Sequence, residues 1–266
     1  MKTIGIEAFL TWAYREELPK AEAPGSGEGM VAMGNGWDSV AQQGELMAEC
    51  VSDGRPNSYG VIPLSAWYGL PPHPDAFAAH AAVCELAKVE LDIPEGWAPL
   101  SCLGLTPEEA DDAVRRALPR VAVRQGDVWR LRCKPAELVR RFAILGGAPC
   151  WQTEAPKRRL VTVSGKPAWF RMIDATTHLG RIERREVSGY NVRAKRPYPG
   201  AYRKTMLEPD PAFAVVDRAE YEVWHAALGL LVEVLSEPGV LVAHQLLPSI
   251  APSRPWENLA ASNTAA

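Results

Sequence analysis

The spacing of apolar residues changes twice along this chain of 266 residues. Residues 4–18, 37–50, 75–91 and 211–235 place apolar side chains three and four positions apart, which is the spacing of an amphipathic helix. Within residues 121–132 and 159–194 the pattern changes to one typical of strands. We therefore expect an α+β fold, with helical N- and C-terminal parts around a basic, strand-rich antiparallel middle.

Several of the expected helices carry boundary signals. The segment Thr106–Glu109 has the form of a capping box, in which the threonine caps a helix and the last glutamate reaches back to it. Asp75 and Asp210 are suited to cap the helices that follow them. Pro135 opens a further helix, and Gly146-Gly147 ends it.

Two hairpins are expected in the middle of the chain. The first joins strands 121–124 and 128–132, and the second joins strands 159–163 and 168–173 through a turn at 164–166. Further strands are expected near residues 181–187 and 190–194, followed by a loop rich in proline and tyrosine at 195–204, and then by the helix 211–235.

Charge is divided unevenly along the sequence. The net charge is only −3, but residues 115–206 hold 22 Lys and Arg against 6 Asp and Glu, whereas residues 1–114 hold 5 against 18. Residues 207–266 are again acidic. Following this pattern we expect three regions: an acidic and mostly helical region at 1–104, a basic helix and hairpin region at 105–206, and a long helix with a tail at 207–266.

A basic segment between acidic ones is typical of a site for a polyanion. Its cations would meet phosphates, and its aromatic rings would stack on bases or pack beside the backbone. The alternative is that the acidic parts neutralise the basic one within the folded protein. The expected nucleic-acid-binding residues are Arg115, Arg116, Arg124, Arg130, Arg132, Arg158, Arg159, Lys166, Trp169, Arg171, Arg184, Arg185, Arg193, Lys195, Arg196, Tyr198, Tyr202, Arg203 and Lys204.

The segment 106–134 runs from a helix into a basic hairpin, an order that resembles the recognition helix and wing of winged-helix proteins. The first turns of this helix are acidic, with Glu108, Glu109, Asp111 and Asp112, whereas a recognition helix leads with residues that read bases. Those acids suit the positive end of the helix dipole instead. A winged-helix-like unit is therefore one alternative for this segment.

His73, Asp75, His80 and Cys84 form a small cluster of residue types that bind metals, and His80 and Cys84 share one helix face. A histidine and a cysteine of the helix core are the simpler interpretation, so we assign no metal and no cofactor to the chain. No phosphate-binding loop, G-x-S-x-G, H-E-x-x-H or G-x-G-x-x-G motif occurs. We therefore do not expect an enzyme.

The composition places the chain in a reducing compartment. The five cysteines stand singly, without a C-x-x-C pair, and are expected to be small core residues. No apolar run approaches the roughly 20 residues of a membrane span. The first residues lack the segments of a signal peptide. We expect a cytoplasmic protein that does not contact membranes.

Several segments of the sequence resemble segments of uncharacterised proteins carried by bacterial prophages. They are residues 9–20 (FLTWAYREELPK), 135–147, 195–202 (KRPYPGAY), 220–228 (EYEVWHAAL) and 254–257 (RPWE). The resemblance would span most of the chain. It implies a phage-related setting, in which regulators, DNA-handling proteins and inhibitors of host machinery are common, and it assigns no residue a role.

Taken together, the sequence predicts a phage-related nucleic-acid-binding protein, foremost a DNA-binding regulator of transcription whose basic centre holds double-stranded DNA. The acidic helical parts would form a homodimer or contact a host protein such as RNA polymerase. The first alternative is a protein–protein adaptor or an inhibitor of a host complex, without nucleic-acid contact. The second alternative is an enzyme with an unfamiliar site around residues 73–84.

Overall fold

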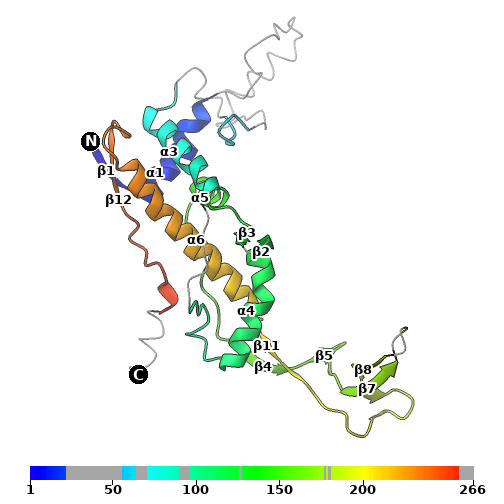
Figure 1. The fold of residues 1–266 in the computed structure, drawn as a ribbon. Coiled ribbons are helices and arrows are strands. Elements are labelled where there is room, and N and C mark those ends of the chain that lie inside the picture. Colours follow the sequence, from blue (N-terminus) through cyan, green and yellow to red (C-terminus); the bar gives the residue numbers. More distant parts are fainter. Residues whose placement is uncertain are drawn as a thin grey trace, which may run out of the picture. The chain divides into compact units, whose positions relative to one another are not determined.

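The computed structural model describes residues 1–21, 56–63, 71–89, 96–125, 128–176, 178 and 181–257. These residues form both helices and strands, so the expected α+β class is confirmed (Figure 1). The expected helix at 37–50 and the hairpin turn at 126–127 lie outside the described residues. No helix among the described residues is long and apolar enough to cross a membrane.

The chain folds into two compact units, and each unit is built from separate pieces of sequence. Unit 1 comprises Met1–Pro99, Leu118–Trp151 and Val216–Ala266, and unit 2 comprises Leu100–Ala117 and Gln152–Val215. Two helices have residues in both units, namely α4 (Pro107–Val121) and α6 (Pro211–Leu235).

Unit 1 is mostly helical. Its remaining elements are β1 (Lys2–Gly5), α1 (Ile6–Trp12), the π-helical turn η1 (Ala13–Glu17), the 3₁₀ turn η2 (Leu18–Lys20), α3 (Pro74–Glu85), the 3₁₀ turn η4 (Leu86–Lys88), β2 (Ala122–Gln125), β3 (Val128–Leu131), α5 (Pro135–Leu145) and β12 (His244–Leu247). Figure 1 shows α1, α3 and α5 gathered near the C-terminal half of α6.

The core of unit 1 lies along α6. Trp224, Leu228 and Leu231 of this helix are at most 3% exposed. The ring of Phe142 on α5 meets that of Trp224 edge to face, with 6.4 Å between centroids. The expected apolar stripe of α6 is therefore largely correct, but Phe213 at its start is 57% exposed.

A parallel strand pair joins the two ends of unit 1. Lys2 to Gly5 pair with His244 to Leu247, residue by residue. The helix that was expected to begin at residue 4 begins at Ile6, because the backbone of Lys2–Gly5 is hydrogen-bonded to β12 as strand β1. The helix then continues as η1 and η2, which carry it through Pro19.

The start of α3 differs from the expectation that Asp75 caps it. The capping residue is His73, whose Nδ1 accepts a hydrogen bond of 3.0 Å from the backbone N–H of Asp75. The Asp75 side chain instead accepts from the backbone N–H groups of residues 242–244, which precede or begin β12. The carboxylate of Asp75 therefore binds a segment distant in sequence and does not cap its own helix.

A buried arginine links three parts of unit 1. Arg218 on α6 is 1% exposed and donates to the carbonyl oxygens of Pro99 and Trp151. Its guanidinium also lies 5.1 Å from the centroid of the Trp256 ring, which is fully buried. Two carbonyl oxygens and an aromatic face thus compensate for the loss of water around this charge.

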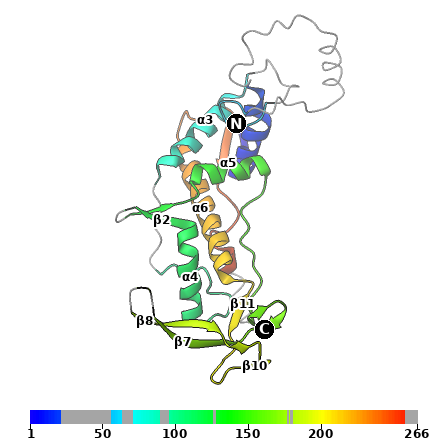
Figure 2. The same cartoon turned by 90° about the vertical axis from the view of Figure 1, so that its right-hand side faces the viewer.

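Unit 2 contains the rest of the strands, all paired antiparallel in twos (Figure 2). They are β4 (Lys157–Leu160) with β11 (Thr205–Glu208), β5 (Thr162–Val163) with β6 (Lys166–Pro167), β7 (Phe170–Thr176) with β8 (Ile182–Ser188), and β9 (Tyr190–Asn191) with β10 (Arg196–Pro197).

For the second expected hairpin, the position of the turn was predicted correctly, but the strands that pair were not. Ser164 and Gly165 have φ values of 51° and 75°, as a two-residue hairpin turn requires, but this turn joins only β5 and β6. The basic strand β4 pairs instead with β11, where Glu208 lies opposite Lys157. The first expected hairpin is confirmed as β2 and β3, in unit 1.

Gly189 stands where two backbone segments of unit 2 nearly touch. Its N–H donates to the carbonyl of Trp169 at 2.6 Å. A Cβ atom at this position would lie 2.7 Å from the backbone carbonyl of Phe170. Any side chain here therefore has to push the start of β7 away from the turn that follows β8.

We expect Gly189→Ala to destabilise unit 2 by about 1–3 kcal/mol, because the added methyl meets backbone that cannot rotate away. Gly229→Ala is the matched control, since a Cβ at this exposed position inside α6 meets nothing within 4 Å. It should stabilise the protein by about 0.5–1 kcal/mol. Denaturant unfolding measures both changes, and a neutral Gly189→Ala would contradict the described close approach.

Candidate functional site

Part of the basic region is neutralised by the acidic start of α4. Arg158 of β4 donates three hydrogen bonds, of 2.8, 2.9 and 3.2 Å, to the carboxylate of Glu109. Glu109 also completes the expected capping box, accepting from the N–H of Thr106 at 3.1 Å. The hydrogen bonds from Thr106 and Arg158 hold the pKa of Glu109 below its usual value.

Arg116 is held in the same way. It bonds Asp210 at 2.7 Å and Asp112 at 2.9 Å, and these hydrogen bonds, that of Asp210 first, raise its pKa. Further ion pairs of cations expected to bind nucleic acid are Arg115 with Asp112, Arg159 with Glu208, Arg184 with Asp174, and Lys204 with Glu186. Each of these six cations therefore has a carboxylate partner within unit 2.

The aromatic residues expected to stack on bases also have partners inside unit 2. The guanidinium of Arg171 lies 3.7 Å from the centroid of the Tyr198 ring, and that of Arg203 lies 4.5 Å from the centroid of Trp169. Tyr202 donates its hydroxyl proton to Glu186, and this bond raises the pKa of the phenol. One face of Tyr198 and of Trp169 is therefore covered by an arginine.

The turn between β9 and β10 is different. Arg193, Lys195 and Arg196 are exposed there, and within the described part of the chain none of them forms an ion pair. The side chain of Asn191 shapes the turn, because its Oδ1 accepts the backbone N–H groups of Arg193 and Ala194 at 3.0 Å. We call Arg193, Lys195 and Arg196 the basic tip.

Two more expected cations, Lys166 and Arg185, are exposed in unit 2 and have no ion pair among the described residues. Lys166 follows the β5–β6 turn, and Arg185 lies on β8 opposite Ile173. The unpaired cations of unit 2 are thus spread over its hairpins and are densest at the basic tip.

The remaining expected cations belong to unit 1 and not to unit 2. Arg130 lies on β3, and Arg132, just after it, donates to the carbonyl of Pro119 at 2.6 Å. Arg124 lies on β2, and its side chain is outside the described residues. The winged-helix alternative is not confirmed, because the hairpin and most of α4 fall in different units.

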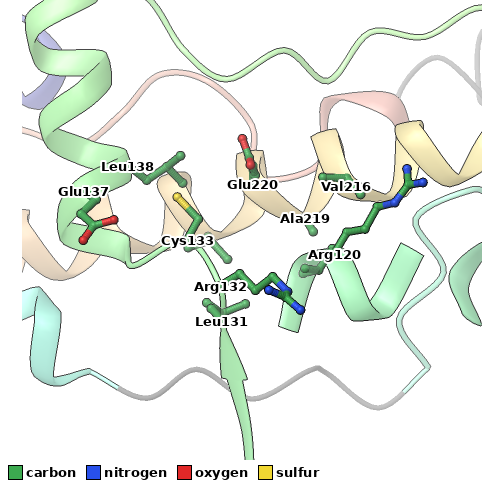
Figure 3. A pocket seen from close by; sticks show the side chains of 11 residues that line it. Arg120, Leu131, Arg132, Cys133, Glu137, Leu138, Val216, Ala219 and Glu220 are labelled. Atoms are coloured by element: carbon green, nitrogen blue, oxygen red, sulfur yellow. The ribbon is translucent and has the colours of Figure 1, made fainter. Parts of the chain in front are cut away.

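A hollow of about 270 Å³ opens in unit 1 between β3, α5 and α6 (Figure 3). Figure 3 shows Cys133 between the carboxylates of Glu137 and Glu220, with Arg132 and Arg120 along the opposite side. Burial, then the negative charge of Glu220, raises the pKa of the Cys133 thiol. A nucleophile needs the thiolate, and the surroundings of Cys133 favour the neutral thiol.

The expected cluster of His73, Asp75, His80 and Cys84 divides into two groups. His80 lies 3.4 Å from the Cys84 sulfur and 3.1 Å from the Tyr14 hydroxyl. Burial and the nearby Arg140 lower the pKa of His80. Cys84 is exposed, as is Cys150, so the expectation of core thiols is wrong for both.

His73 and Asp75 meet a residue that sequence spacing did not indicate. His244 places its Nδ1 2.8 Å from the Oδ2 atom of Asp75, across 169 positions of sequence. Burial raises the pKa of Asp75, but the hydrogen bonds from Val242, His244 and Ala243 together outweigh it, so the pKa lies below its usual value. Asp75 is therefore a buried, charged carboxylate.

The comparisons with known proteins leave the site without a precedent. No protein-family model, no curated protein and no solved structure matches this chain.

The position of Cys133 gives a prediction about its reactivity. We expect iodoacetamide to label Cys133 more slowly than the exposed Cys150, because carboxylates beside the thiol disfavour the thiolate. Glu220→Gln should speed labelling of Cys133, by up to about tenfold if the pKa falls by one unit.

Arg141→Gln is the control of opposite sign, because Arg141 lowers the pKa of Cys133. It should slow the labelling. Mass spectrometry of the two peptides over time measures these rates, and an unchanged rate in both variants would show that access alone governs Cys133.

Proposed function

We propose that unit 2 binds nucleic acid through the basic tip between β9 and β10. The observation that carries this proposal is the contrast inside unit 2. Arg158, Arg116 and Lys204 are matched with carboxylates, whereas Arg193, Lys195 and Arg196 remain exposed without them. Charges that need no internal partner are available to phosphates.

The backbone of the tip supports the same interaction. Lys195 has a φ of 50°, an unusual conformation for a lysine, and the Asn191 side chain holds the turn in shape. Cations on a preformed turn lose less conformational entropy on binding than cations on a flexible chain. Contacts of this kind position a phosphate backbone but read no base sequence.

Double-stranded DNA is the ligand we propose first, with regulation of transcription in a phage-related setting as the biological role. The major groove of double-stranded DNA is wide enough to admit an antiparallel pair of strands, such as β9 with β10. A homodimer or a host partner such as RNA polymerase remains part of this proposal and rests on the sequence alone.

A second candidate is the protein–protein adaptor, because unit 2 exposes large apolar side chains next to its charges. Ile182 is 74% exposed, Val192 79% and Met172 46%. Val192 directly precedes the basic tip. Apolar side chains beside a charged patch are also found where proteins bind proteins.

The test is a fluorescence titration with random double-stranded DNA at several salt concentrations. A variant carrying Arg193→Gln, Lys195→Gln and Arg196→Gln should bind more weakly, and the slope of log affinity against log salt should fall by roughly 3, at about 0.9 per lost phosphate contact.

The matched control carries Arg115→Gln, Arg159→Gln and Arg184→Gln, which removes the same charge from cations that already have carboxylate partners. It should change the slope by less than about one unit. If the two variants weaken DNA binding equally, the binding depends on the net charge of the protein and not on the basic tip. Parent protein that binds no DNA at low salt would leave the adaptor as the better proposal.

A further inference from the structure

We propose that His73, Asp75 and His244 of unit 1 form a binding site for a divalent transition-metal ion of the zinc type. This departs from the expectation of a chain without metal, and it is independent of nucleic-acid binding. One nitrogen from each of the two histidines and one carboxylate oxygen of Asp75 lie within 4.8 Å of one another. These three residues come from the start of α3 and the start of β12.

The distances are within reach of a metal once the two imidazole rings turn. In a tetrahedral zinc site with bonds of about 2.0 Å, neighbouring ligand atoms lie about 3.3 Å apart. Here Nδ1 of His244 lies 2.8 Å from Oδ2 of Asp75, and Nδ1 of His73 lies 3.8 Å from Oδ1. These two distances run to different oxygens of Asp75, and all three ligand atoms lie within 4.8 Å of one another, so rotation of the imidazole rings would be needed to bring them to one ion.

The charge of the site favours a cation. Asp75 is fully buried, and among the described residues no lysine or arginine pairs with it. Its negative charge is balanced only by backbone N–H groups and by imidazoles. A divalent ion would add a positive charge beside this buried carboxylate, within reach of the half-buried His73.

The surroundings hold the ligands in place. The carboxylate of Glu17 accepts the backbone N–H of His73 at 2.9 Å. The Trp12 ring lies against both imidazoles, with centroids 5.4 Å from His73 and 4.5 Å from His244. Glu17 and Trp12 are positioning residues, which fix the rings and shield them on one side.

A metal ion bound at these atoms replaces two hydrogen bonds, and every proton involved keeps a place on the protein. The proton that His244 directs at Asp75 moves from Nδ1 to Nε2 of the same ring, so the imidazole stays neutral. The Nδ1 atom of His73 gives up the hydrogen bond from the N–H of Asp75 and turns its lone pair to the ion. Two imidazoles with one carboxylate favour zinc, cobalt or nickel over calcium or magnesium.

The competing role is purely structural, with Asp75 serving only to tie residues 242–244 to α3. The experiment distinguishes the two with ions as probes. The full chain, stripped with a chelator, is titrated with Zn²⁺ by calorimetry and with Co²⁺ by visible absorption. We expect one ion per chain, and a cobalt spectrum without a thiolate charge-transfer band.

His73→Asn is the informative variant, because asparagine also caps helices well and leaves the rest of the cluster in place. It should weaken Zn²⁺ binding by more than the roughly 10- to 100-fold that loss of an outer partner costs. His80→Asn is the matched control, since His80 lies on the same helix with Cys84 as its partner, and it should bind Zn²⁺ like the parent.

Three results would overturn the proposal. They are the absence of stoichiometric Zn²⁺ binding in the parent, unchanged binding in His73→Asn, and loss of binding in His80→Asn together with a cobalt–thiolate band, which would move the site to Cys84. His244→Gln provides a second arm, with circular dichroism to establish that the variant is folded before its affinity is compared.

Discussion

The carboxylate of Asp75 accepts hydrogen bonds from three successive backbone N–H groups, those of Val242, Ala243 and His244. This interaction anchors the segment that becomes β12, and β12 in turn pairs with β1 directly before α1. The carboxylate of Asp75 thus connects α3 to β12 and, through the pairing of β12 with β1, to the start of α1. Burying such a charge is tolerable only because its lone pairs are satisfied.

Unit 2 follows a different principle. None of the residues of β7 and β8 is fully buried: those of β7 largely alternate between half-buried and exposed, and those of β8 are mostly exposed. Cross-strand and strand-to-helix ion pairs, such as Arg158 with Glu109, stand where a hydrophobic core would otherwise be. Surface ion pairs contribute little each, typically below about 1 kcal/mol. The ion pairs Arg159 with Glu208 and Arg184 with Asp174 join paired strands, whereas Arg193, Lys195 and Arg196 form no ion pair among the described residues.

Local signals in the sequence predicted local structure well. The capping box of Thr106 and Glu109 forms as expected, and α6 has the expected bounds, because a cap and an apolar stripe act within a few residues. Partners distant in sequence could not be predicted. The alternation at 159–163 indicated a strand but could not say that β4 would choose β11. Likewise, a cationic segment does not reveal which of its charges meet carboxylates, so only part of the expected interface remains free.

The parallel pairing of β1 with β12 has a consequence for how the chain is made. The first strand leaves the ribosome long before its partner, and the contacts of unit 1 that span the whole chain are slow to form because of the entropy of closing so long a loop. Residues 152–215, by contrast, have emerged before the closing strand is synthesised. Until then β1 lacks its partner, and the N–H and C=O groups that β12 will pair with are open to other strands.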